Sequence, residues 1–144
     1  MRILRLLRLL AVATLAVSSL AAQQAPNRPV PRVVQLDSAA RSYTEVLGGP
    51  PASVTMESGQ VVLAPGDSVR RHNTGRYEEV VIVLAGTGAM RIRGRPALTL
   101  RPGAVAYCPP QTEHDVVNTG AVPLRYLYVA ARTPDPGSGS VPPN

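Results

Sequence analysis

The residues of this sequence best suited to chemistry are its two histidines, His72 and His114, and an acidic pair, Glu78 and Glu79, that follows the first histidine. Imidazole nitrogens and carboxylate oxygens are donors that divalent transition metals accept in proteins, and two imidazoles with one carboxylate leave coordination positions open. On an extended strand, neighbouring side chains point to opposite faces, so only one of the two glutamates can lie with the imidazoles. The residue types therefore favour a site for one divalent metal ion.

Each histidine stands in a spaced pattern of residues. The first pattern consists of Gly66, His72, Thr74, Glu79 and Gly86, with five, one, four and six residues between successive members. The second pattern consists of Gly103, Pro109, Gln111, His114 and Asn118, with five, one, two and three residues between successive members. In this order they resemble the two motifs of the cupin superfamily, in its small single-domain, cupin-2 form, over about residues 54–130. Thr74 stands where a second His is usual, and Gln111 replaces a Gly.

The resemblance implies a closed jelly-roll barrel, the cupin double-stranded β-helix, with one metal ion inside it. The implied ligands are His72, Glu79 and His114, and the ion would be Fe, Mn, Zn, Ni or Cu. Glu78 stays open as the alternative to Glu79, because the family also permits a shorter spacing after Thr74. A Thr hydroxyl is a poor ligand for these ions, so three protein ligands remain where the family usually has four. Candidate pocket residues near the ion are Thr74, Tyr107, Gln111 and Asn118, with Tyr77 a further source of a hydroxyl.

Two functions are consistent with such a site. A metal with open positions could act on a small organic molecule, as an oxidoreductase of the dioxygenase kind or as an isomerase. Alternatively, the barrel is a non-catalytic module that binds a small ligand without an essential metal. No second acid–base constellation indicates a reaction class, and the fold alone does not select one.

Short extended runs at nearly even spacing, separated by Gly- and Pro-containing turns, predict an all-β protein. The runs are residues 33–36, 53–57, 60–63, 69–72, 79–84, 89–93, 97–100, 104–108, 114–118 and 124–130. Residues 37–47 are the one segment expected to carry a short helix. The chain has no Phe and no Trp, so its core must be built from aliphatic side chains and a few Tyr. Cys108 is the only cysteine, which excludes an intramolecular disulfide.

Both faces of the run from Glu79 to Leu84 are apolar. An antiparallel strand that faced water on one side would be polar there. Both faces are therefore expected to be covered, either by a second layer or by another subunit, and a homodimer is the preferred interpretation.

The net charge of +6 does not indicate a nucleic-acid partner. All fifteen basic residues are Arg, and three of them lie in the first eight residues. Without these three, twelve Arg remain against nine acidic residues, a net charge of +3. These Arg are dispersed and lack interleaved aromatic residues. One of five other arginines could face an anionic substrate, although an exposed position is preferred for Arg91, Arg93 and Arg95. The arginines in question are Arg70, Arg71, Arg91, Arg93 and Arg95.

The first residues are typical of a secretory signal peptide, with three Arg followed by an apolar run and small residues. We predict a signal peptide over residues 1–22, with cleavage after Ala22 or after Ala21, and an uncleaved anchor as the less favoured alternative. The mature protein would then be exported, periplasmic or secreted, with no stable membrane span. A lead segment over 23–43, a cupin barrel over 44–132 and a disordered Pro/Gly/Ser tail over 133–144 complete the predicted organisation.

Overall fold

The computed structural model describes residues 28–134, which form strands and turns and no helix. The strands of this part of the chain are β1 (Thr44–Leu47), β2 (Met56–Leu63), β3 (His72–Asn73), β4 (Tyr77–Ala85), β5 (Gly88–Ile92), β6 (Leu98–Leu100), β7 (Val105–Cys108), β8 (Glu113–Asn118) and β9 (Leu124–Arg132). Every strand pair is antiparallel. The all-β prediction is confirmed.

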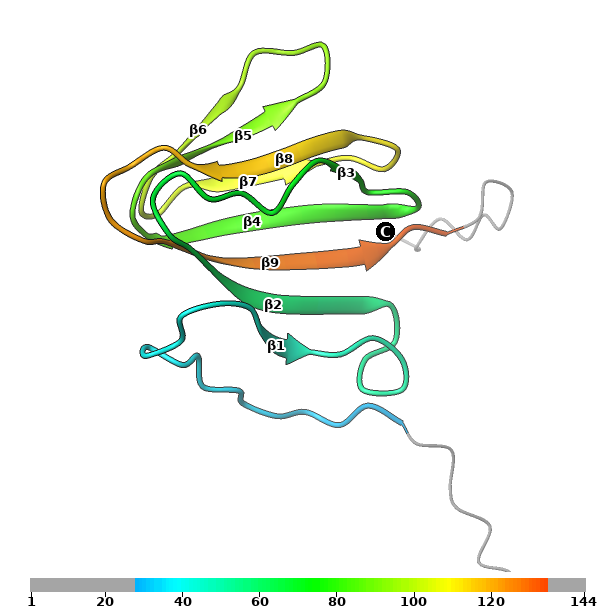
Figure 1. Ribbon diagram of the computed structural model, residues 1–144. Coiled ribbons are helices and arrows are strands. Elements are labelled where there is room, and N and C mark those ends of the chain that lie inside the picture. Colours follow the sequence, from blue (N-terminus) through cyan, green and yellow to red (C-terminus); the bar gives the residue numbers. More distant parts are fainter. Residues whose placement is uncertain (1–27, 135–144) are drawn as a thin grey trace, which may run out of the picture.

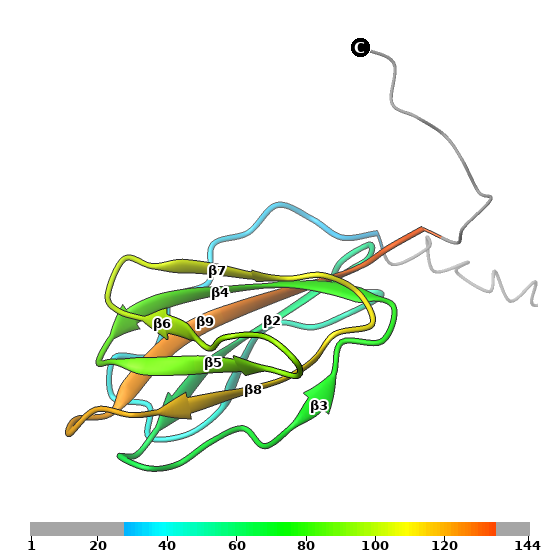
Figure 2. The same ribbon diagram turned by 90° about the horizontal axis from the view of Figure 1, so that it is seen from above.

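The strands form two sheets that face each other, as the two views in Figure 1 and Figure 2 show. One sheet has five strands in the order β1-β2-β9-β4-β7, and the other has four in the order β3-β8-β5-β6. The last two strands of the chain each lie inside a sheet, with β9 between β2 and β4 and β8 between β3 and β5. From β2 to β5 and from β6 to β9, consecutive strands therefore lie in opposite sheets, which is the jelly-roll arrangement of the predicted barrel.

The core between the sheets consists of aliphatic side chains with one buried tyrosine, as the composition predicts. Its members alternate along their strands with residues of the opposite face. They are Val61, Leu63, Val81, Val83, Met90, Leu100, Ala106, Cys108, Val116, Leu124 and Tyr126. Full burial of a Val, Leu or Met side chain contributes about 1.5–3 kcal/mol. Packing of this kind takes the place of a disulfide, since the one cysteine is a free thiol in the core.

The helix expected over residues 37–47 is wrong. The carboxylate of Asp37 accepts a hydrogen bond from the Ala39 N–H at 2.8 Å, which forms a turn and not a helix. The chain then extends into β1, where Thr44 pairs with Gln60 of β2. The extended run predicted at 33–36 also forms no strand. Pairing with β2 overrides the weak local helix preference, because tertiary hydrogen bonds outweigh propensity.

The outer face of β4 is less covered than its composition suggests. Val81 and Val83 on the inner face are buried, but Leu84 on the outer face is 43% exposed. On the neighbouring strand β7, Val105 and Tyr107 are 66% and 51% exposed. Within residues 28–134, no second layer of this chain covers that part of the sheet.

The predicted signal peptide (residues 1–22) and residues 135–144 of the predicted tail lie outside the described residues. β1 begins at Thr44 and β9 ends at Arg132. The segment before β1 runs alongside β1 and β2 (Figure 1), where the Gln60 side chain donates a hydrogen bond to the Asp37 carbonyl at 2.8 Å.

Candidate metal centre

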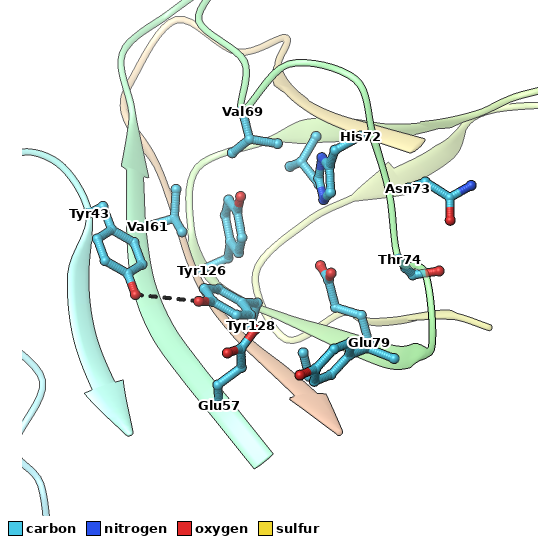
Figure 3. Close-up of a pocket in the computed structure, with 13 residues that line it drawn as sticks. Tyr43, Glu57, Val61, Val69, His72, Asn73, Thr74, Glu79, Tyr126 and Tyr128 are labelled. Carbon is cyan, nitrogen blue, oxygen red and sulfur yellow. Dashed lines mark hydrogen bonds between the residues drawn. The ribbon is translucent and has the colours of Figure 1, made fainter. Parts of the chain in front are cut away.

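Two strands of the four-stranded sheet bring the two imidazoles together. His72 on the short strand β3 is the direct pairing partner of His114 on β8, and the ring centroids lie 4.4 Å apart. Glu79 lies on β4 of the opposite sheet and reaches across the barrel toward them. One donor atom from each of the three residues lies within 4.8 Å of the other two. Figure 3 shows the His72 ring and the Glu79 carboxylate pointing toward each other across the cavity.

Hydrogen bonds at the far nitrogen of each ring select the tautomer. His72 Nδ1 lies 3.0 Å from the Arg70 carbonyl oxygen, and His114 Nδ1 lies 3.4 Å from that of Thr112. A carbonyl oxygen can only accept, so in the neutral rings these contacts favour the proton on Nδ1. His114 Nδ1 also lies 3.3 Å from Cys108 Sγ, which can donate as well as accept. The lone pair is then on Nε2, the nitrogen that faces the cavity. Backbone contacts of this kind orient metal-binding imidazoles.

His114 Nε2 is buried and has no hydrogen-bond partner. It lies 3.6 Å from Glu79 Oε1, which is too long for a good hydrogen bond. A neutral imidazole therefore directs its lone pair at a carboxylate, an arrangement that is unfavourable unless a proton or a cation lies between them. Burial lowers the pKa of His114, but the Glu79 carboxylate outweighs it, and the net effect raises the pKa above its ordinary value.

The three residues fit a divalent transition metal. Two imidazole nitrogens and one carboxylate oxygen are suited to ions such as Fe, Mn, Zn, Ni or Cu and leave positions open for water or a substrate. Thr74 does not point its hydroxyl at the group. Its Oγ1 donates to the Pro109 carbonyl and accepts the Thr112 N–H, both at 3.0 Å.

The two adjacent glutamates lie on opposite faces of β4, as strand alternation requires. Glu79 is in the donor group, whereas the Glu78 carboxylate accepts a hydrogen bond from the Tyr107 hydroxyl at 3.1 Å on the outer face. The structure thus brings Glu79, and not Glu78, to the imidazoles.

The other candidate pocket residues lie in different places. Of these candidates, Thr74 and Tyr77 line the cavity beside the donor group. Asn118 is buried elsewhere and donates to the carbonyls of Leu63 and Val122 at 2.9 and 2.8 Å. It therefore joins the connection before β9 to the end of β2.

Tyr107 and Gln111 also lie away from the cavity. Tyr107 is on the outer face of β7, and Gln111 is in the turn before β8 with φ of 58°. That left-handed conformation favours glycine, which explains why the motif has a Gly there. The arginines considered for an anionic substrate are all exposed and absent from the cavity wall.

Residues that the sequence analysis missed make up much of the cavity wall. The cavity has a volume of about 460 Å³, and its wall also includes Tyr43, Glu57, Val61, Val69, Asn73, Val116, Tyr126, Tyr128 and Ala130. Alternation along the predicted strand 124–130 places Leu124, Tyr126, Tyr128 and Ala130 on one face, and this signal could have identified the two tyrosines. For Tyr43 there was no such signal, because its segment was expected to be helical.

The fold agrees with comparisons to known proteins. The family model described as "Cupin domain" matches residues 53–130, and the chain belongs to this family. Comparison with curated proteins found no match. Within residues 28–134 there is no helix of the length and apolarity needed to cross a membrane.

Many solved structures share the fold. A cupin-2 conserved barrel protein from Salinispora arenicola is 23% identical, with a TM-score of 0.59, and the match covers 72% of this chain and 91% of that one. TT1209 from Thermus thermophilus is 27% identical, with a TM-score of 0.55 and coverage of 65% and 86%. The cupin domain of Cnp3 from Schizosaccharomyces pombe is 14% identical, with a TM-score of 0.57. In that case the match covers 63% of this chain and only 60% of the other.

Proposed function

We propose that this cupin holds one divalent metal ion through His72, Glu79 and His114 and acts on a small organic molecule bound in the adjoining cavity. The observation that carries the proposal is the buried Nε2 of His114, which lies 3.6 Å from Glu79 Oε1 and has no hydrogen-bond partner. A cation between the two atoms would satisfy both. Structural ion pairs also occur in barrels, but here a second imidazole contributes a third donor within 4.8 Å.

The chain's own residues supply orientation and shielding. In the neutral rings, the Arg70 and Thr112 carbonyls at Nδ1 favour a lone pair on Nε2. Burial shields His114 from water, whereas His72 is exposed. When bound, a divalent ion would supply Lewis-acid chemistry toward a substrate oxygen or, as Fe(II), chemistry with dioxygen. The proposed reaction class is accordingly an oxidoreductase of the dioxygenase kind or an isomerase.

The test is elemental analysis of protein purified without a histidine tag, alongside His72→Ala, Glu79→Ala and His114→Ala. We expect one Fe, Mn, Zn, Ni or Cu per chain, with metal lost from all three variants. Glu78→Ala is the matched control and should keep its metal, since Glu78 lies on the outer face with Tyr107. A wild-type protein that binds no metal after reconstitution would overturn the proposal, and iron would direct assays to dioxygen chemistry.

A second candidate function is a ligand-binding module without catalysis. The position of Thr74 favours it, because the hydroxyl at the place of a fourth ligand is bound to Pro109 and Thr112 instead. Two results together would support a binding module over an enzyme. The His114→Ala variant would bind the ligand with unchanged affinity, and the metal-loaded protein would show no turnover.

We also propose that the chain is exported and that its mature form is a homodimer. The basic and apolar pattern of the first residues supports export, and the exposed apolar side chains of β4 and β7 support dimerisation. Cell fractionation with mass measurement of the mature N-terminus tests the first. Recovery of uncleaved protein in the cytosol would overturn it.

A further inference from the structure

Tyrosines are concentrated around the candidate metal centre. The chain has five tyrosines and no Phe or Trp, and four of the five line the cavity: Tyr43, Tyr77, Tyr126 and Tyr128. Tyr126 and Tyr128 project from β9, while Tyr43 comes from the segment before β1 (Figure 3). The rings of Tyr43 and Tyr128 are stacked, with centroids 6.4 Å apart and an interplanar angle of 24°.

A glycine makes room for this stacked pair. A Cβ atom at Gly59 would lie 2.4 Å from the Tyr43 ring and 2.8 Å from the Tyr128 ring. Gly59 is the pairing partner of Tyr128 between β2 and β9. The two aromatic rings therefore occupy space that a larger residue on β2 would take, and they form one wall of the cavity.

The hydroxyls of two of these tyrosines, Tyr126 and Tyr128, stay uncharged. Burial, followed by the charge of Glu79, raises the pKa of Tyr126 well above its ordinary value. Burial also raises the pKa of Tyr128, with a further contribution from its contact with Tyr43, whose hydroxyl oxygen lies 3.4 Å away. Such hydroxyls offer hydrogen bonds to a ligand but no charge.

Apart from the tyrosines, His72, Asn73 and Thr74, the polar part of the wall is acidic. Glu57 and Glu79 line the cavity, and no arginine lines it within the described residues, although the chain has fifteen basic residues. Arg71, which precedes His72 in the sequence, and Arg93 on the turn after β5 pair instead with Glu113 outside the cavity. The two carboxylates would just balance one divalent ion. An anionic ligand would lose its hydration without finding a cationic side chain.

We propose that the cavity selects an uncharged aromatic molecule, with its ring against the tyrosine faces and an oxygen substituent directed toward the His72, Glu79 and His114 group. This inference rests on the proposed function for the orientation of the oxygen, but the preference for an uncharged ring comes from the cavity wall alone. Stacked and edge-to-face aromatic contacts stabilise a bound ring beyond simple burial. The absence of cationic side chains from the wall, together with the charges of Glu57 and Glu79, disfavours a carboxylate in the same position.

The test compares three small probes of similar size, benzyl alcohol, cyclohexylmethanol and benzoate, by calorimetry or ligand-observed NMR with the full chain. We expect benzyl alcohol to bind roughly two- to tenfold more tightly than cyclohexylmethanol, in line with the extra stabilisation of aromatic pairs. Benzoate should bind about tenfold more weakly than benzyl alcohol, because its charge is desolvated without a partner. Equal affinity for the two alcohols, or tighter binding of benzoate, would overturn the assignment.

Two variants of the same type sharpen the test. Tyr128→Leu removes a ring from the cavity wall, and Tyr107→Leu removes the one tyrosine outside it. Only Tyr128→Leu should reduce the preference for benzyl alcohol over cyclohexylmethanol. If both variants reduce it equally, the preference does not come from the cavity. Glu57→Gln should improve benzoate binding selectively.

Each measurement is made on metal-free and on zinc-loaded protein, so that the two proposals can fail separately. Elemental analysis decides whether the metal is held. The ratio of the affinities of the metal-free protein for benzyl alcohol and cyclohexylmethanol decides whether the wall prefers an aromatic ring. Benzoate that bound more tightly than benzyl alcohol to either form would exclude the uncharged class, whatever the metal result.

Discussion

The hydroxyl of Thr74 joins two loops and does not face the metal donors. It bridges the Pro109 carbonyl and the Thr112 N–H, which belong to the turn leading into β8. His114 comes two residues after Thr112 in the sequence. The two hydrogen bonds of Thr74 therefore fix the start of β8, the strand that carries this proposed metal ligand. At the motif position where a second His is usual, this chain therefore has a structural contact.

Thr74→Val therefore tests a structural role. The variant keeps the side-chain shape but removes the hydrogen bonds to the partly buried Pro109 carbonyl and Thr112 N–H, which costs about 0.5–1.5 kcal/mol of the free energy of unfolding. Denaturant titration measures the loss, and metal content should stay at the wild-type value. Thr99→Val, at an exposed position on β6, is the control and should change stability by no more than about 0.5 kcal/mol. A loss of metal without a loss of stability would assign Thr74 to the centre itself.

Cys108 lies in the core with its sulfur 3.3 Å from His114 Nδ1. Burial, and then the charge of Glu79, raises the pKa of the thiol above its ordinary value. We expect a thiol reagent at pH 8 to leave the folded protein unlabelled and to react fully once denaturant unfolds it, because the thiolate is the reactive form. Mass spectrometry counts the added label. Rapid labelling of the folded protein would show that the edge strand β7 opens.

At the scale of elements, glycines let the turns between strands bring the motif residues into position. Gly86, in the turn between β4 and β5, has φ of 77°, and a Cβ there would lie 2.4 Å from the Pro123 carbonyl oxygen. Gly66 has a similar φ of 83°, but nothing lies within 4 Å of its Cβ position. The two motif glycines thus share a backbone requirement and differ in packing.

This difference gives a matched pair of variants. Gly66→Ala should lower the free energy of unfolding by about 1–2 kcal/mol, the penalty of a left-handed conformation. Gly86→Ala should lower it further, because its methyl group also meets backbone atoms of the connection before β9. Urea unfolding of both variants measures the difference. Equal losses would mean that this connection moves freely out of the way.

At the scale of the whole molecule, the outer face of β4 and β7 presents Leu84, Val105 and Tyr107 to solvent. In the register of the two strands, Val105 is paired with Ile82 and Tyr107 with Val80, so the apolar side chains are contiguous. Contiguous exposed apolar surface of this kind often marks an interface between subunits. A second copy of the chain is our preferred partner.

We expect light scattering after size exclusion to give a dimer for the wild type and a monomer for Val105→Arg. The arginine would bring a charge into the proposed interface. Since Val105 is 66% exposed, the substitution should leave the fold unchanged by circular dichroism. Val122→Arg, at a 58% exposed position in the connection before β9, is the control and should remain dimeric. A monomeric wild type would contradict the proposed homodimer.

Much of this protein can be predicted from its sequence, because the informative contacts are local. The two spaced motifs resemble those of the cupin superfamily, and that resemblance points to His72, Glu79 and His114 without coordinates, with Glu78 left open. The turn residues and the aliphatic runs predict the strands. These features depend on alternation and turn geometry, which act over a few residues.

Only the tertiary structure decided what surrounds the donors. The tyrosine wall combines β9 with the segment before β1, and these meet because β2 lies between β1 and β9 in the sheet. The sequence likewise could not show that Tyr107 and Asn118 face away from the cavity or that the segment before β1 is extended. Such facts depend on the register between strands far apart in the chain, and a shift of one residue would send each side chain to the other face.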